Sequence, residues 1–97
     1  MRRQYYVYIM TNKPFGTLYV GMTNDLVRRT WEHREGMVEG FTSDFGLKTL
    51  VWYEIHGNAY EAIRREKAIK RWHRDWKVNL IQEKNAQWRD LYSAICG

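Results

Sequence analysis

Two short runs of apolar and aromatic residues near the start of the chain are separated by turn-forming residues. Residues 5–10 form an unbroken run rich in strand formers, and residues 12–16 supply the Asn, Pro and Gly that favour a turn. Residues 17–22 form a second strand-like run directly after the turn. Because so few residues separate the two runs, the pattern predicts an antiparallel hairpin.

A helical pattern follows the hairpin. Asn24 and Asp25 can cap a helix over residues 25–35, and Gly36 marks its end. The helical spacing lets four residues of this segment face inward, namely Leu26, Val27, Thr30 and Trp31. We therefore expect this helix to pack on the hairpin.

The rest of the chain is predicted to hold a third strand and two more helices. Residues 40–46 have the composition of a loop, and residues 48–55 that of a strand. Asn58 is the predicted N-cap of a helix with apolar positions at Ala59, Ala62, Ile63, Ile69 and Trp72 or Trp76. Residues 83–94 are predicted to form the last helix, packed on the sheet through Trp88, Leu91, Tyr92 and Ile95. This order of elements predicts one α/β domain over residues 1–97.

The composition fits a small folded domain with a basic surface. With 97 residues, of which 44% are hydrophobic and 15% aromatic, the chain can bury one core but not two. Sixteen Lys and Arg against eleven Asp and Glu give a formal charge of +5. This charge favours a polyanionic partner, although a basic surface without such a partner gives the same balance.

The single cysteine and the N-terminal residues bear on the compartment. Cys96 has no second cysteine to pair with, so we expect a reducing compartment, the cytoplasm. Residues 1–10 hold too few apolar residues for the core of a signal peptide. No run is long enough to cross a bilayer, so no membrane partner is expected.

Charged residues on the first predicted helix are candidates for phosphate binding. Arg29 and His33 are four positions apart and share a face, with Arg28 and Arg34 beside them. Cationic or titratable groups on one face suit a phosphate. The alternative is a solvated helix surface, because glutamates are interleaved with these residues.

Glu66 is the most informative acidic residue. Ala62, Ile63 and Ile69 bracket it at helical spacing, which places its carboxylate beside the apolar stripe of the helix. Burying this carboxylate without a partner would be costly. It is therefore either the partner of Lys70 in an i,i+4 ion pair or the ligand of a metal ion.

A strip of basic residues surrounds Glu66, interrupted by two tryptophans. Its cations can neutralise several phosphates on one side of a nucleic acid, and Trp72 and Trp76 can stack on exposed bases. Alternatively, the tryptophans belong to the core and the cations to a solvated surface. The strip comprises Arg64, Arg65, Lys67, Lys70, Arg71, Arg74 and Lys77.

The ordered set of these motifs resembles the signature of the GIY-YIG nucleases. The first motifs are Tyr6-Val7-Tyr8 and Tyr19-Val20-Gly21-Met22-Thr23, followed by Asp25-Leu26 with Arg29 and His33. The likeness continues to Glu66 and Lys70 and to Asn79, so it covers nearly the whole chain, and it is strongest to the small standalone bacterial members. One departure is Tyr6, which stands where the first glycine of the signature is found.

The resemblance implies a fold and a set of catalytic roles. The implied fold is a central three-stranded antiparallel sheet flanked by helices, in agreement with the order of elements above. The implied activity is DNA endonuclease, with Glu66 holding Mg²⁺ or Mn²⁺. Tyr8 and Tyr19 would orient and deprotonate the attacking water, with Tyr19 the preferred base. Arg29 would neutralise the developing charge, His33 would relay a proton or hold the phosphate, and Asn79 would orient a neighbouring group.

The expected substrate is DNA, bound by Gly21, Thr23, Lys70, Arg71, Arg74 and Lys77. Because a chain of this length has no room for a sequence-reading domain, we expect branched, single-stranded or damaged DNA and a link to repair or recombination. We expect a monomer or a weak homodimer. The competing hypotheses are a nucleic-acid-binding module that does not cut, and a protein-interaction factor that uses exposed aromatic residues.

Overall fold

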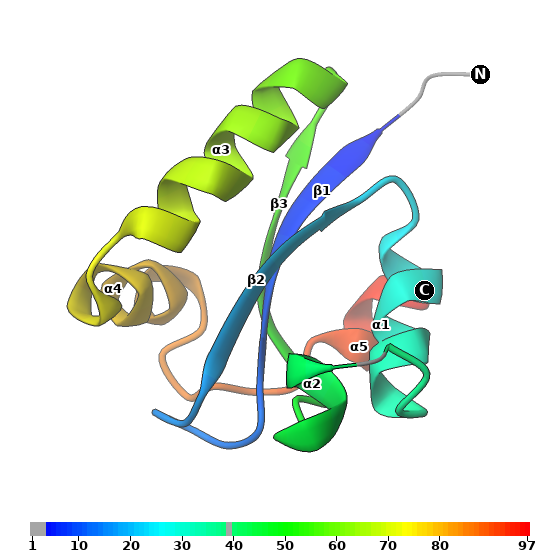
Figure 1. Cartoon of the computed structure of the whole chain (residues 1–97), viewed down its shortest axis with the longest axis vertical. Coiled ribbons are helices and arrows are strands. Elements are labelled where there is room, and N and C mark those ends of the chain that lie inside the picture. The colour runs from blue at the N-terminus through cyan, green and yellow to red at the C-terminus, as the bar shows by residue number, and fades with distance from the viewer. Residues whose placement is uncertain (1–3, 39) are drawn as a thin grey trace.

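A three-stranded antiparallel sheet with helices on both faces forms the molecule (Figure 1). The computed structural model describes residues 4–38 and 40–97. Its elements are β1 (Tyr5–Thr11), β2 (Leu18–Thr23), α1 (Leu26–Arg34), α2 (Phe41–Asp44), β3 (Thr49–His56), α3 (Ala59–Arg71), α4 (Arg74–Lys84) and α5 (Tyr92–Ile95). The predicted fold class is therefore confirmed. No helix in these two ranges has the length and apolar character needed to cross a membrane.

The sheet has the order β2-β1-β3, which leaves β2 at one edge. Both neighbours of β1 run antiparallel to it, so the predicted hairpin is confirmed. Tyr8 in the middle of β1 lies opposite Gly21 of β2 and Tyr53 of β3. A register shift between Ile9 and Met10 interrupts the pairing with β3.

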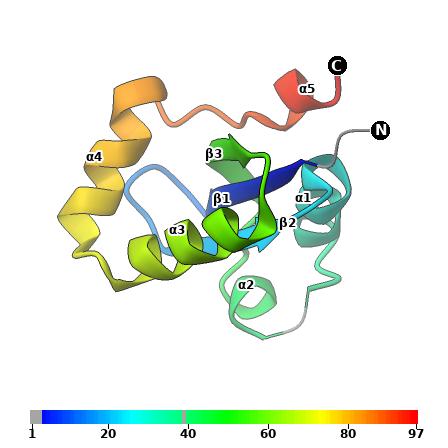
Figure 2. The same cartoon turned by 90° about the horizontal axis from the view of Figure 1, so that it is seen from above.

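The two faces of the sheet carry separate hydrophobic clusters. Side chains that alternate along β1 point to opposite faces, so Val7 and Ile9 join one cluster while Tyr8 and Met10 join the other. Helices α3 and α4 cover the first face, and α1, α2 and α5 lie on the second (Figures 1 and 2). In Figure 1, β2 stands in front, between α3 and α1, at one edge of the sheet.

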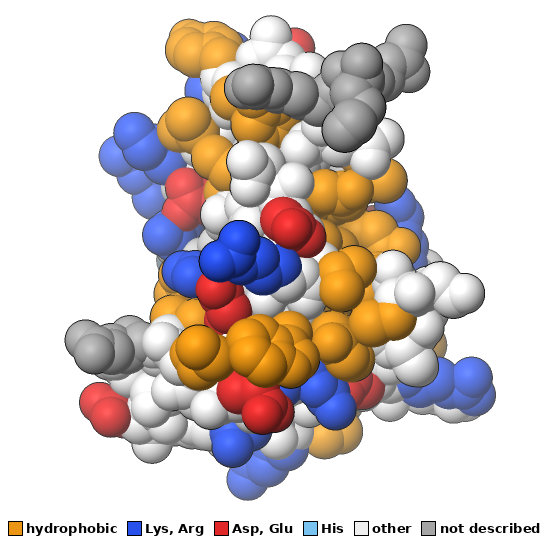
Figure 3. All heavy atoms as spheres, turned by 90° about the vertical axis from the view of Figure 1, so that its right-hand side faces the viewer, with side chains coloured by type: hydrophobic (Ala, Val, Ile, Leu, Met, Phe, Trp, Pro, Cys, Tyr) orange, Lys and Arg blue, Asp and Glu red, His pale blue; other side chains and the backbone are white. Residues whose placement is uncertain are grey.

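Helix α1 begins where the sequence predicts, but it is rotated relative to the expected inward face. The backbone N–H of Arg28 donates to Asp25 Oδ1 over 3.2 Å, which confirms Asp25 as the N-cap. The buried positions are Leu26 and Thr30, as predicted, together with His33, which was not among the predicted inward residues. Val27 and Trp31 are 38% and 45% exposed, so their predicted inward orientation is wrong. The side of the molecule that carries α1 accordingly mixes apolar and charged side chains (Figure 3).

The helix predicted after Asn58 is two helices. Asn58 Oδ1 accepts from the backbone N–H of Tyr60 over 2.7 Å and so caps α3 as predicted. The backbone becomes extended at Trp72, with φ −64° and ψ 150°, and α4 starts two residues later. This break separates the two tryptophans: Trp72 is half-buried on the core, whereas Trp76 is 56% exposed.

The predicted helix over residues 83–94 is wrong. Asn85 ends α4 and is buried, donating from Nδ2 to the carbonyls of Val51 and Arg89 over 3.0 and 2.9 Å. Its Oδ1 accepts from the backbone N–H of Arg89, so the side chain holds the chain in a turn. Trp88 in this turn has a φ of 56°, which a helix does not allow.

The aromatic and aliphatic residues of this last segment serve both faces of the sheet. Trp88 joins the cluster under α3 and α4, whereas Leu91 and Ile95 pack with the cluster under α1. They were predicted to lie on one side of a helix, which the turn at Asn85 prevents. A smaller correction concerns the predicted loop 40–46, which contains the one-turn helix α2.

Candidate active site

Gly21 makes room for two tyrosines on the α1 face of the sheet. A Cβ atom at this position would lie 2.5 Å from Tyr8 Oη and 2.9 Å from Tyr19 Cε2. Both distances are shorter than real carbon contacts, so only glycine allows the tyrosine rings their present positions. The first part of the predicted site is therefore assembled by strand pairing alone.

A buried hydrogen bond connects β1 to α1 at this place. Tyr8 Oη lies 3.0 Å from Nε2 of His33, and the two side chains are 25 positions apart in sequence. Tyr19 completes an aromatic cluster, with its ring centroid 6.3 Å from that of Tyr8 and 5.6 Å from that of His33. In the described part of the chain, the buried His33 Nδ1 has no hydrogen-bond partner.

Burial controls the protonation of this pair. It raises the pKa of Tyr8 to about 12, although the nearby Arg29 guanidinium acts in the opposite direction. Burial also lowers the pKa of His33 to about 4, and the positive charge of Arg29 lowers it further. At neutral pH the site therefore holds a neutral phenol and a neutral imidazole.

Arg29 interacts with Tyr8 of the buried cluster and also lines a surface groove. The groove has a volume of about 640 Å³, and its lining includes Thr23, Arg28 and Arg29. Glu32 lies in the same groove and binds both arginines, with Oε1 3.3 Å from Nη1 of Arg29 and Oε2 3.6 Å from Nε of Arg28. Glu32 is one of the glutamates interleaved with the basic residues of this helix, and its i,i+3 and i,i+4 spacing to the two arginines is the sequence signal for this contact.

Glu66 and Lys70 approach the cluster from α3. The two side chains form an ion pair, so the first of the two predicted possibilities for Glu66 is present. The Glu66 side chain is 13% exposed and that of Lys70 is 50% exposed. Lys70 Nζ lies 5.9 Å from the ring centroid of Tyr19. Residues of α3, β2 and α1 are thus brought together around the edge of β2.

The donor groups around Glu66 limit which metal ion this site can hold. Within residues 4–38 and 40–97, no three His, Cys, Asp or Glu side chains converge on one point. This excludes a closed zinc-type site in the described chain. A hard ion such as Mg²⁺ keeps several waters and takes one or two carboxylates, so the single, largely buried carboxylate of Glu66 fits it.

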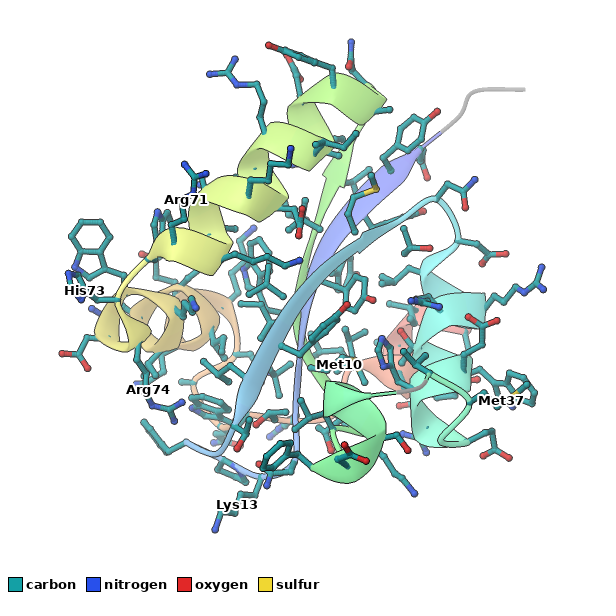
Figure 4. All side chains as sticks on the ribbon, in the orientation of Figure 1. Met10, Lys13, Met37, Arg71, His73 and Arg74 are labelled. Carbon is teal, nitrogen blue, oxygen red and sulfur yellow. The ribbon has the colours of Figure 1, made fainter. Side chains whose placement is uncertain are left out.

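Several cations of the basic strip are engaged in structural contacts. Arg74 Nη2 donates to the carbonyls of Phe15 and Gly16 over 2.5 and 2.6 Å and so ties α4 to the β1–β2 turn. Lys77 Nζ donates to the Lys70 carbonyl at the end of α3 over 3.2 Å. Arg71 points away from the sheet and is exposed (Figure 4). Of these three, Arg71 is the freest to meet a phosphate.

Asn79 is not brought to the aromatic cluster. It is exposed on α4 and lines a separate hollow of about 280 Å³ together with Trp72, Trp76, Leu80 and Glu83. The other candidates, Tyr8, Tyr19, Arg29, His33 and Glu66, do not line this hollow. The structure therefore divides the predicted residues between two places.

Comparison with known protein families gives a match for the sequence. The model of the GIY-YIG catalytic domain matches residues 4–79, a range that begins before Tyr8 and ends at Asn79. The chain belongs to the GIY-YIG family. Membership places it in a nuclease superfamily, whose members act on nucleic acids and generally depend on divalent metal ions.

Relatives of the GIY-YIG chain are small bacterial proteins. It is 39% identical over 80 residues to a UPF0213 protein of Clostridium perfringens, covering 82% of this chain and 85% of that protein. It is 34% identical over 80 residues to one of Staphylococcus saprophyticus, covering 82% and 96%. The solution NMR structure of a UPF0213 protein from Bacillus halodurans is similar with a TM-score of 0.56 and 30% identity, over 90% of this chain and 92% of that one.

We predict that Gly21→Ala destabilises the protein, because the added methyl group must displace Tyr8 or Tyr19. Overpacking of this kind costs about 1–3 kcal/mol in the free energy of unfolding, measurable by urea denaturation. Gly57→Ala is the matched control, since a Cβ at Gly57 meets no atom within 4 Å. Equal stabilities of the two variants would show that Gly21 does not shape the site.

We predict that the buried, neutral His33 makes the protein less stable as the pH falls from about 6.5 to 4. In this window the unfolded chain takes up a proton that folded His33, with its pKa lowered to about 4, does not. The linked loss is up to about 3 kcal/mol, because each pKa unit corresponds to about 1.4 kcal/mol. Unfolding free energies measured across this range should fall less steeply for His33→Gln, and parallel curves would contradict the prediction.

Proposed function

We propose that this protein is a divalent-metal-dependent DNA endonuclease whose active site lies at the edge of β2. The observation that supports it most is the meeting of three elements at that edge: the Tyr8–His33 hydrogen bond, Tyr19 and the Glu66–Lys70 pair. Hydrolysis of a phosphodiester needs an oriented water, a proton acceptor and positive charge near the phosphate. These side chains offer each of them.

The tyrosines are assigned different tasks. Tyr8 is 1% exposed and its pKa is raised to about 12 by burial, so it neither meets solvent nor ionises readily. Tyr19 is only partly buried and contacts Lys70, so we assign it the contact with the attacking water. The hydrogen bond between Tyr8 and His33 then fixes the two rings that pack against Tyr19 and so supports its orientation.

The positive groups are assigned to the phosphate. Arg29 lies in the groove beside the cluster, where its guanidinium can neutralise charge that develops on the phosphate oxygens. Lys70, on the other side of Tyr19, can bind a second oxygen. Glu66 would hold a metal ion, which would supply Lewis-acid charge and help to activate water. Asn79 is assigned to substrate contact in the hollow on α4 instead of to the chemistry.

We expect Glu66→Gln to abolish metal-dependent cutting while the fold is kept, because the amide has nearly the same shape but is a poor ligand for a hard cation. The assay incubates each protein with single-stranded, duplex and branched DNA in Mg²⁺, Mn²⁺ or EDTA and follows the products. Glu61→Gln, which removes an exposed carboxylate from the same helix α3, is the control and should cut normally. Normal cutting by Glu66→Gln would remove Glu66 from the mechanism.

A nucleic-acid-binding module that does not cut is the second candidate. It is favoured by two observations, the pairing of Glu66 with Lys70 and the exposure of Asn79 away from the tyrosines. In the same assay it gives no product with any metal ion, together with binding that weakens steeply as salt is raised. The two functions are therefore separated by one set of incubations.

For the substrate, we propose DNA with unpaired bases. Trp76 is 56% exposed, and its ring lies edge-on to Trp72 at 5.9 Å and to His73 at 6.1 Å. Arg71, which is exposed, and His73 both lie at the α3–α4 junction (Figure 4). An aromatic surface beside cations suits bases that are free to stack, which a duplex does not offer.

Trp76→Ala is expected to weaken binding of single-stranded DNA by roughly tenfold, because stacking of a base contributes about 1–3 kcal/mol. Binding of duplex DNA should change little. Fluorescence anisotropy with labelled oligonucleotides measures both affinities. Trp31→Ala is a matched control, since Trp31 is another exposed tryptophan, on α1. Equal losses for the two DNA forms, or for the two variants, would contradict the proposed preference.

A further inference from the structure

The Glu66 carboxylate already has a cationic partner in the absence of metal. Among the ion pairs of the described residues, Glu66 takes part in one, with Lys70. The two residues are four positions apart on α3 with the acid first, which is the favourable order on a helix. Whatever cation binds Glu66 therefore meets an existing ion pair.

The burial of the two side chains determines which member of the ion pair can move. Glu66 is largely buried, with 13% of its side chain exposed, so few waters solvate the carboxylate and a counter-ion is needed. Lys70 is half exposed, and its four-carbon stem is flexible. The acid is thus fixed, whereas the ammonium group can leave.

The Lys70 ammonium group also lies near a second interaction partner, the ring of Tyr19. Its Nζ is 5.9 Å from the ring centroid of Tyr19, on the side where the aromatic cluster lies. A divalent cation at Glu66 would repel the ammonium group, since like charges disfavour each other at short range. The displaced side chain would then be directed toward Tyr19 and a phosphate bound beside it.

We propose that Lys70 is the internal counter-ion of Glu66 and that a divalent cation binds this carboxylate only by displacing it. The proposal rests on the role proposed for Glu66 above. Lys70 thereby keeps the metal affinity of the free protein low. A phosphate that takes up the ammonium group would raise this affinity, so that metal and nucleic acid bind together.

The test is a titration of the purified, full-length protein with Mn²⁺ alone, without DNA. Free Mn²⁺ is followed by electron paramagnetic resonance, which needs no enzymatic activity. Lys70→Met removes the competing charge and keeps a helix-forming side chain of similar length. Lys67→Met is the matched control, because it removes the same charge from an exposed position on α3 next to Glu66. Lys70→Arg restores a cation, and Glu66→Gln removes the ligand.

Lys70→Met is expected to bind Mn²⁺ roughly two- to fivefold more tightly than Lys67→Met, as release from a partly exposed ion pair would give. Lys70→Arg should return toward the wild-type affinity, and circular dichroism shows whether each variant is folded. Equal affinities of the two methionine variants would overturn the proposal for Lys70 while leaving the nuclease function intact. Mn²⁺ binding that is unchanged in Glu66→Gln, or absent from every variant, would overturn both the proposal and the metal role of Glu66.

Discussion

The hydrogen bond between Tyr8 and His33 is the interaction on which the arrangement of the candidate site depends. It joins the central strand to α1 through a buried polar contact of 3.0 Å. Burying a phenol and an imidazole is favourable only if each satisfies the other, so the contact fixes both the rotation of α1 and its distance from the sheet. The same constraint requires glycine at position 21 and turns Val27 and Trp31 toward solvent.

The sequence predicted the elements that depend on local signals. The hairpin, the third strand and the caps at Asp25 and Asn58 follow from residues within a few positions of each other, and each is found in the structure. The wrong helix over residues 83–94 has a different origin, because Asn85 there bonds to the carbonyl of Val51, 34 positions away. Apolar spacing cannot reveal a tertiary contact that overrides helix formation.

In the candidate site, too, some features follow from local sequence spacing and others depend on tertiary structure. The i,i+4 pairs Arg29–His33 and Glu66–Lys70 could be derived from spacing, and each pair lies on one face of its helix in the structure. How far Asn79 lies from the tyrosines could not be derived, because it depends on the break between α3 and α4 at Trp72. Membership of the GIY-YIG family places the chain in a nuclease superfamily, but it does not show how this chain places such residues.

The last segment of the chain has a consequence for the solution behaviour of the protein. Leu91 donates from its backbone N–H to the carbonyl of Leu50 over 2.8 Å, and the Leu50 N–H donates to Asp90 Oδ1 over 3.3 Å. At this point of β3 the backbone groups that face away from β1 are therefore already occupied. An exposed strand edge invites pairing with a strand of another molecule, which is a common route to aggregation. The C-terminal segment thus covers this part of the β3 edge, whereas β2, the strand that carries Tyr19, forms the other edge of the sheet.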